Sequence, residues 1–246
     1  MNFQYKCSYA TRPGILHAKE NLPCQDKIAV LRQNSICAAA LADGAGSQPR
    51  SDKGAELVSQ EAVRLLTEQF DQLWGLNDEE RTNALLTALL LPLQKEAPPV
   101  KELASTLLFI AGHHDGRFLT GHIGDGAIVW VDDEGTFPYS SPENGTFANE
   151  TFFLTGEDAA QHFRVKTGVL RQSGAVLLMS DGMAESLIRR SDQTPAPACA
   201  AMAKWLQDEE EDRISQAYAR NLEQVFSHHS QDDLGIATVA WNKICE

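Results

Sequence analysis

The sequence predicts an α+β protein in which helices and strands occupy separate parts of the chain. Two successive helical segments follow an N-terminal group of strands, and a later helical region precedes the final strand. Between them lies a series of short strands separated by turn sequences such as His-Asp-Gly, which are typical of antiparallel hairpins. A doubly wound parallel sheet would instead need a helix between successive strands.

The N-terminal strands are predicted over residues 3–10 and 27–42, because both stretches are rich in Val, Ile, Ala and aromatic residues. Residues 36–41 are continuously apolar, which is typical of a buried strand. This run ends at Asp43 and Gly44, and the chain then resumes as a helix rather than as a return strand.

Two helices are predicted next. Apolar residues at nearly helical spacing indicate a helix over 52–74, with Ser51 as its N-cap. A second helix begins at Asn77, and Glu80 three residues later completes a variant of the capping box. This helix runs to about Lys95, where the sequence Ala-Pro-Pro-Val stops it.

The rest of the chain is predicted to be mostly strands. They cover residues 106–113, 117–123, 127–132, 163–168, 175–180 and 235–241. The links at 114–116 and 124–126 are hairpin-like. Residues 132–162 are polar and contain short strand-like pieces such as Thr-Phe-Phe-Leu, so we interpret them as a surface insertion. A helical region follows over 194–228, interrupted near an Asp-Glu-Glu-Glu-Asp run.

Composition excludes several classes of protein. The 246 residues, 43% of them hydrophobic, predict one domain over 1–246 that needs no disulfide to fold. A net charge of −13 argues against binding to nucleic-acid phosphates. The longest apolar run, 84–93, is too short to cross a bilayer, and five irregularly spaced cysteines favour a reducing compartment. We expect a cytoplasmic monomer that contacts neither nucleic acid nor membrane.

Aspartates recur at the ends of the predicted strands. Asp43 and Asp181 each follow a long apolar strand, Asp125 lies between two strands, and Asp232 and Asp233 precede the last one. Asp-Gly is also a common turn dipeptide, so a turn alone explains any one of them, and at Asp125 the two interpretations are equally good. At Asp43 and Asp181 the sequence that follows looks helical or irregular, which favours a functional role.

Carboxylates at the converging ends of packed strands repel one another and raise each other's pKa unless a cation neutralises them. A site with only oxygen ligands suits Mg²⁺ or Mn²⁺ better than zinc. Two such ions close together can hold a bridging hydroxide and clamp a phosphoryl group for in-line displacement.

Six short motifs occur in the order found in one enzyme family and are spread over almost the whole chain. They are CQDKIAV (24–30), LADGAG (41–46), ASTLLFI (104–110), HIGDGAIVW (122–130), LLMSDGMAE (177–185) and QDDLGIATV (231–239). With these motifs the chain resembles the metal-dependent Ser/Thr protein phosphatases (PPM, or type 2C), in particular their bacterial branch. The resemblance implies a four-layer α-β-β-α sandwich with two antiparallel sheets and metals at one end of the sheets.

The resemblance also implies a reaction and a set of roles. A metal-bound hydroxide would hydrolyse phosphoserine or phosphothreonine in a protein substrate, with no phosphoenzyme. Asp43 would bridge two Mg²⁺ or Mn²⁺ ions and the Gly44 carbonyl would bind the second ion. Asp181 and Asp232 would complete the first ion.

Two further roles and a ranking follow from the same resemblance. Asp26 would hold metal-bound waters and would act with Asp43, Asp181 and Asp232 in catalysis. Asp125 together with Asp181 could hold a third, weaker ion. Many relatives have Asn where this chain has Asp233, which ranks Asp233 below Asp232 as a ligand.

Three positions depart from the family pattern. Gln25 replaces a common acidic residue, Asn21 replaces an Arg that grips the substrate phosphate, and Ala45 replaces the His of eukaryotic members. The phosphate-binding residue is therefore unknown, and the proton donor to the leaving group is unassigned. The candidates for phosphate binding are His17, Lys19, Arg12 and Arg50.

These departures leave a second hypothesis open, a non-catalytic binding or regulatory module with the phosphatase fold. Binding of a divalent ion with turnover would favour the enzyme, and the absence of both would favour the module. We also expect the insertion at 132–162 to lie near the metal site and to help select substrates, because loops carry specificity on a rigid scaffold.

Overall fold

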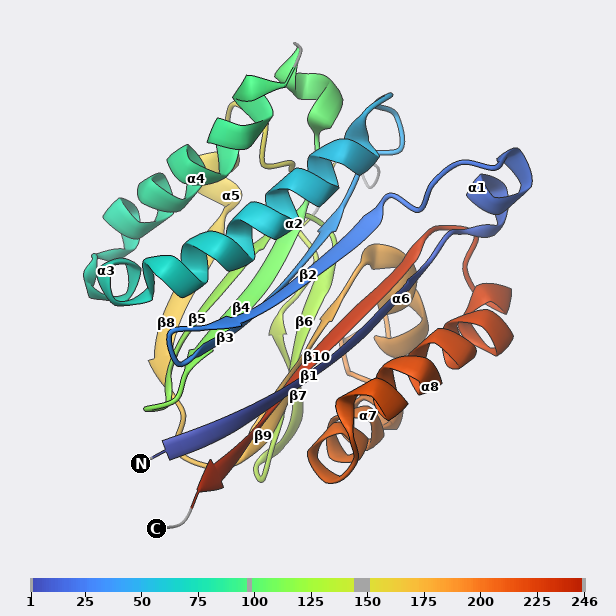
Figure 1. The fold of residues 1–246 in the computed structure, drawn as a ribbon. Coiled ribbons are helices and arrows are strands. Elements are labelled where there is room, and N and C mark those ends of the chain that lie inside the picture. The colour runs from blue at the N-terminus through green and yellow to red at the C-terminus, as the bar shows by residue number, and fades with distance from the viewer. Residues whose placement is uncertain (1, 97–98, 144–150, 245–246) are drawn as a thin grey trace.

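The computed structural model describes residues 2–96, 99–143 and 151–244, in which two five-stranded antiparallel sheets pack face to face between layers of helices (Figure 1). One sheet has the strand order β1 (Asn2–Arg12), β10 (Leu234–Ile244), β9 (Gly174–Met179), β6 (Ala127–Asp132) and β7 (Gly135–Ser140). The other has the order β2 (Asp26–Gln33), β3 (Ile36–Asp43), β4 (Leu107–His113), β5 (Arg117–Ile123) and β8 (Arg164–Val169). The predicted α+β class and its four layers are confirmed.

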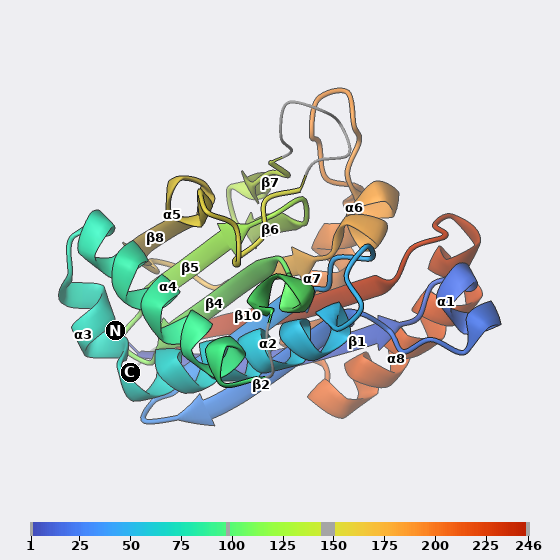
Figure 2. The ribbon, with the colours of Figure 1, turned by 90° about the horizontal axis from the view of Figure 1, so that it is seen from above.

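Helices cover the outer face of each sheet (Figures 1 and 2). Over the β2–β8 sheet lie α2 (Ser51–Glu68), α3 (Phe70–Gly75), α4 (Asp78–Lys95) and the short α5 (Ala159–His162). Over the β1–β7 sheet lie α6 (Asp181–Leu187), α7 (Pro197–Asp208) and α8 (Glu211–Gln224). Shorter elements are α1 (Ile15–Glu20) and two 3₁₀ turns, Val100–Leu103 and Phe226–His228.

The unbroken apolar run in β3 follows from this layering. Alternate residues of a strand point to opposite faces of the sheet. Ala38, Ala40 and Ala42 pack under the helices, whereas Ala39 and Leu41 belong to the core between the sheets. Because both faces of the strand are buried, no position along it favours a polar residue, and the first polar side chain appears where the strand ends.

Several local predictions need correction. The stretch 27–42 is a hairpin and not one strand, because Asn34 and Ser35 take positive φ of 53° and 65° in a two-residue turn. The helix predicted over 52–74 is interrupted at Gln69. The link at 124–126 is not a hairpin, because β5 and β6 belong to different sheets and this link crosses from one to the other.

Two predicted helix caps and one predicted hairpin turn can be compared with the structure. The capping box is confirmed: the Glu80 amide donates to Asn77 Oδ1 at 2.9 Å, and the Asn77 amide donates to Glu80. Ser51 is the first residue of α2 and not its cap; its hydroxyl donates to the Gln48 carbonyl at 3.1 Å. The link at 114–116 is the predicted hairpin turn, with Gly116 at φ 96°.

The segment 132–162 has more regular structure than predicted. It contains β7, which is an edge strand, and α5, whereas Thr-Phe-Phe-Leu is not a strand. Residues 144–150 of this segment lie outside the described residues, as do the first two residues of Ala-Pro-Pro-Val. In Figure 2, β7 lies beside β6, whereas α5 lies beside β8, away from α6.

Candidate metal centre

Three aspartates from different parts of the chain meet at one end of the two sheets. Asp43 ends β3, Asp125 lies in the link between the sheets, and Asp181 begins α6 after β9. One carboxylate oxygen from each lies within 4.8 Å of the others. The group includes Asp125, for which the sequence favoured a turn and a metal role equally. Three converging carboxylates are a donor set for a hard divalent cation.

These carboxylates face a cavity of about 300 Å³. It is lined by His17, Gln25, Asp43, Gly44, Ala45, Gly46, Ser47, Thr106, Asp125, Thr151, Phe153, Asp181 and Asp232. Asp232 lies outside the three-residue group but lines the same cavity. Gly44 is needed at its place because a Cβ there would lie 2.7 Å from the Ser51 carbonyl group, where α2 passes close to the strand end.

Asp26 is buried directly behind this group. It pairs with Asp43 across the β2–β3 ladder, so the two side chains leave the same face of the sheet. Its side chain is 1% exposed, and neither carboxylate oxygen is in hydrogen-bonding geometry with another group of the described residues. A buried carboxylate without partners is costly. Ordered waters or a cation in the adjacent cavity would supply the missing partners.

Burial dominates the electrostatics of the cluster. It raises the pKa of Asp43 well above its usual range, and the charges of Asp26 and Asp181 add to the rise. Burial likewise raises the pKa of Asp181 to about 7, with Asp232 and Asp125 adding repulsion. The pKa of Asp26 is raised mainly by burial, although the nearby Ser180 hydroxyl partly offsets this. Without a cation the cluster therefore retains protons near neutral pH.

Hydrogen bonds from the backbone and two threonines fix the ligand candidates. The Asp43 amide donates to Thr106 Oγ1 at 3.0 Å, and the Thr106 amide donates to the Asp43 carbonyl at 2.8 Å. The Thr151 hydroxyl donates to Asp125 Oδ2 at 2.6 Å. Thr151 belongs to the predicted insertion, so part of that segment contacts an aspartate of the cluster. Thr106 lies within one of the six motifs of the sequence, whereas Thr151 and Phe153 lie in Thr-Phe-Phe-Leu, which indicated a short strand and not a place in the site.

Asp232 and its neighbour Asp233 face different surroundings. Asp232 lines the cavity, and burial raises its pKa. Asp233 is 2% exposed, and its carboxylate accepts hydrogen bonds from the backbone of Gly14 and Gln25 and contacts His17. This difference agrees with the ranking of Asp232 above Asp233 as a ligand, which stays a prediction.

Only one of the four candidates for phosphate binding lines the metal cavity. His17 lines the cavity. Arg12 pairs with Glu223 at 3.4 Å and Arg50 pairs with Glu96 at 2.7 Å, and neither lines the cavity. Lys19 lies on α1 and is also outside the lining. Of the four, the geometry brings only His17 to the carboxylates.

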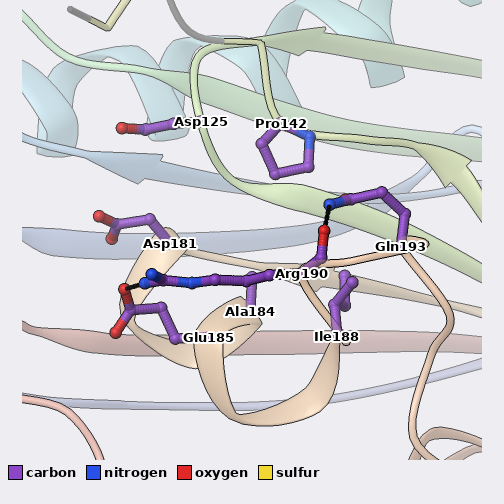
Figure 3. A pocket seen from close by; sticks show the side chains of 8 residues that line it. All are labelled: Asp125, Pro142, Asp181, Ala184, Glu185, Ile188, Arg190 and Gln193. Atoms are coloured by element: carbon purple, nitrogen blue, oxygen red, sulfur yellow. Dashed lines mark hydrogen bonds and ion pairs between the residues drawn. The ribbon is translucent and has the colours of Figure 1, made fainter. Parts of the chain in front are cut away.

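A second cavity, of about 370 Å³, opens on the other side of Asp125 and Asp181 (Figure 3). Pro142 and the residues of α6 and the loop after it form its walls. Its lining residues are Asp125, Pro142, Asp181, Ala184, Glu185, Ile188, Arg190 and Gln193. The Arg190 side chain extends along this cavity toward Glu185, with which it forms an ion pair. The aspartates are thus reached from two adjoining hollows.

The sequence model of protein phosphatase 2C matches residues 14–226, which include all the aspartates of the centre except Asp232 and its neighbour. The chain belongs to the protein phosphatase 2C family. Serine/threonine-protein phosphatase 3 of Escherichia coli (strain K12) is 32% identical over 201 residues, which are 78% of each chain.

Solved structures of other phosphatases share the fold of this protein phosphatase 2C member. The serine/threonine phosphatase of S. agalactiae superposes with a TM-score of 0.62 at 16% identity, covering 96% of this chain and 99% of that one. The catalytic domain of the phosphatase PstP, in complex with two manganese ions, gives a TM-score of 0.61 at 16% identity, covering 98% and 100%.

Membership in the protein phosphatase 2C family confirms the family and the enzyme class expected from the sequence, a metal-dependent protein phosphatase. None of these comparisons favours the non-catalytic alternative. None of the described helices combines the length and apolar character required to span a bilayer.

Proposed function

We propose that this phosphatase hydrolyses phosphoserine and phosphothreonine in protein substrates with two Mg²⁺ or Mn²⁺ ions bound at the strand-end aspartates. The observation that carries the proposal is the meeting of Asp43, Asp125 and Asp181 within 4.8 Å, together with the partnerless Asp26 behind them. The 32% identical relative is a serine/threonine-protein phosphatase, which supports the substrate class. The free cysteines Cys7, Cys24, Cys37 and Cys199 support a reducing, cytoplasmic setting.

The ligand roles in this proposal are those that the family resemblance implies for these positions. Asp43, central in the cluster, would bridge the two ions, and the Gly44 carbonyl would bind the second. Asp181 and Asp232 would complete the first ion. Bound divalent ions supply an activated water and neutralise the charge of the phosphoryl group.

The remaining roles concern groups that position the ligands. Asp26 would anchor waters of the site, because neither of its buried oxygens is in hydrogen-bonding geometry with a described residue and only the Ser180 hydroxyl lies near. Asp125 would hold a third, weaker ion together with Asp181. Thr106 fixes the backbone of Asp43 and Thr151 fixes the Asp125 carboxylate, so both threonines hold ligands in place.

The second cavity supports a protein as the substrate. It adjoins Asp125 and Asp181 and offers the apolar surfaces of Pro142 and Ile188 beside the charged Arg190 (Figure 3). A peptide that places its phosphorylated side chain at the aspartates could lay a neighbouring residue here. The insertion at 132–162 contributes Pro142 to this wall and Thr151 to the metal cavity, which supports the predicted role of this segment in substrate selection.

The test is substitution of two ligands from opposite sheets. Asp43→Asn and Asp181→Asn should each reduce Mn²⁺-dependent hydrolysis of p-nitrophenyl phosphate by at least about 100-fold, which is roughly 3 kcal/mol of transition-state stabilisation. Calorimetric titration with Mn²⁺ should show weakened binding in both. Asp133→Asn, an exposed aspartate outside the cluster, is the matched control and should retain activity. Full activity in either folded cluster variant would refute the proposed site.

A further inference from the structure

Three groups converge on the buried carboxylate of Asp233. The Gly14 amide donates to Oδ1 at 2.6 Å, and the Gln25 amide donates to Oδ2 at 2.5 Å. His17 Nδ1 lies 2.9 Å from the same Oδ1. An asparagine has one acceptor oxygen and would turn an NH₂ group toward one of these donors. The structure therefore gives a reason for Asp at a position where the family resemblance implied Asn.

These bonds hold a segment that has little other anchorage. None of the residues of α1 is buried, and its Ile15 and Leu16 side chains are exposed. The segment does lie close to the Asp232 loop, because a Cβ on Gly14 would overlap the Gln231 carbonyl oxygen. With no apolar face of α1 in the core, the hydrogen bonds to Asp233 do most to fix the helix against the metal cavity.

The contact with Asp233 places the His17 side chain at the metal cavity. Its ring lines the metal cavity and an adjoining hollow of about 130 Å³ that Leu16, Gln231 and Asp232 complete. Nδ1 is engaged by Asp233, and no partner of Nε2 occurs among the described residues. The nitrogens lie on different edges of the ring, so the Nε2 edge is the one available to a ligand.

Asn21, which stands in place of the family's Arg, does not line the metal cavity. It ends α1 in the left-handed conformation, with φ 54°, and its amide donates to the Ala18 carbonyl. Asn tolerates this conformation better than Arg does. The position has become a helix end, and a phosphate-binding group must come from elsewhere.

We propose that Asp233 is a positioning residue that holds His17 over the metal cavity, where Nε2 donates a hydrogen bond to a phosphoryl oxygen of the substrate. The inference rests on the proposed phosphatase function and identifies the residue that takes the place of the missing Arg. With both ring nitrogens as donors, the imidazole would make one charge-assisted hydrogen bond to the Asp233 carboxylate and one to the phosphoryl group. The partner is thus an anionic phosphate monoester.

The test measures phosphate binding apart from turnover. Inorganic phosphate is titrated calorimetrically into the Mg²⁺-loaded wild type and into His17→Ala, Asp233→Asn and the double variant. We expect each single variant to weaken phosphate binding about tenfold, as for loss of one charge-assisted hydrogen bond. The double variant should be no weaker than either single one, because both act through the same imidazole. Glu20→Gln, on the same helix, is the control and should bind phosphate normally.

A second readout reports the positioning itself. In wild type, nitrogen-detected NMR of His17 should show a proton on Nδ1 hydrogen-bonded to Asp233, and Asp233→Asn should abolish this signature. In turnover, both single variants should raise KM for p-nitrophenyl phosphate more than they lower kcat. Mg²⁺ affinity should fall less than phosphate affinity in both variants, because neither side chain is a proposed ligand.

The outcomes separate this inference from the proposed function. Unchanged phosphate affinity in His17→Ala would overturn the inference even if the enzyme turns over. Fully additive losses, or a loss of Mg²⁺ affinity equal to the loss of phosphate affinity, would also overturn it. If wild type shows no turnover while phosphate binding still depends on His17, the phosphatase assignment fails and the anion site stands. His17→Ala alters a partly exposed side chain, so the test remains decisive if Asp233→Asn does not fold.

Discussion

Asp181→Asn should make the metal-free protein more stable at alkaline pH while destroying the metal centre. In the folded protein the pKa of Asp181 is raised from 3.8 to about 7, chiefly by burial and then by Asp232 and Asp125. Between these two pH values the folded state keeps a proton that the unfolded chain has released. The contribution of Asp181 to the free energy of unfolding is therefore most favourable below pH 4, falls as pH rises toward 7, and stays low above it.

The expected gain in stability follows from the difference between the folded and unfolded pKa of Asp181. If Asp181 titrated alone, the rise in its pKa would correspond to a penalty of about 4 kcal/mol above pH 7. Asp232 and Asp125 share the repulsion, so the substitution should recover a part of it, about 2 kcal/mol. For a chain of this length that corresponds to an increase of about 4–8 °C in Tm. At pH 4 the wild-type carboxyl is protonated, and the two proteins should melt within about 2 °C of each other.

The assay is thermal unfolding followed by circular dichroism in EDTA at pH 4 and pH 8, then at pH 8 with added Mn²⁺. A ligand that binds only the folded state at 100 times its Kd stabilises by about 2.7 kcal/mol, so Mn²⁺ should raise the Tm of wild type and leave Asp181→Asn nearly unchanged. Asp133→Asn controls for loss of one surface charge. If metal-free Asp181→Asn melts at or below the wild-type temperature at pH 8, the electrostatic reasoning is wrong.

Two other substitutions test how the strand delivers Asp43. Gly44→Ala forces a Cβ against the Ser51 backbone, so we expect a loss of about 1–3 kcal/mol in chemical denaturation together with weaker Mn²⁺ binding in calorimetry. If neither the free energy of unfolding nor the Mn²⁺ affinity changed, α2 could shift without cost and the reasoning would be wrong. Leu41→Ala empties a fully buried site in the inter-sheet core and should destabilise by about 2–5 kcal/mol, whereas kcat of the protein that remains folded should change less than about threefold. A catalytic loss larger than the stability loss would contradict this separation.

The sequence predicted the two aspartates of the centre that directly follow strands. Asp43 and Asp181 follow apolar runs that must be buried on both faces, so their positions at the end of the sheets follow from the pattern alone. Asp125 was ambiguous because an Asp-Gly link is the same in a hairpin and in a crossing between sheets. Only the tertiary arrangement distinguishes the two, and it places Asp125 with the other two aspartates.

The sequence did not predict which segments far apart in the chain contact each other. Asp233 and His17 are 216 residues apart, and nothing in either local pattern indicates that one holds the other. Thr151 likewise reaches Asp125 from a polar segment without periodicity. Ser51 was misjudged as a cap because Ser is common both at the cap and within the first turn, and the choice depends on how closely α2 approaches Gly44.

The centre takes its aspartates from both halves of the sandwich. Asp43 comes from the end of β3 in one sheet, whereas Asp181 follows β9 in the other. A divalent ion held by both would be a non-covalent cross-link between two layers that otherwise meet through side-chain packing and a few hydrogen bonds, such as that from the Tyr5 hydroxyl to the His113 carbonyl. Separating or sliding the sheets at this end would then require the ion to leave first. Chelation should consequently speed local opening, seen as faster amide hydrogen exchange at the ends of β3 and β9 than at their middles.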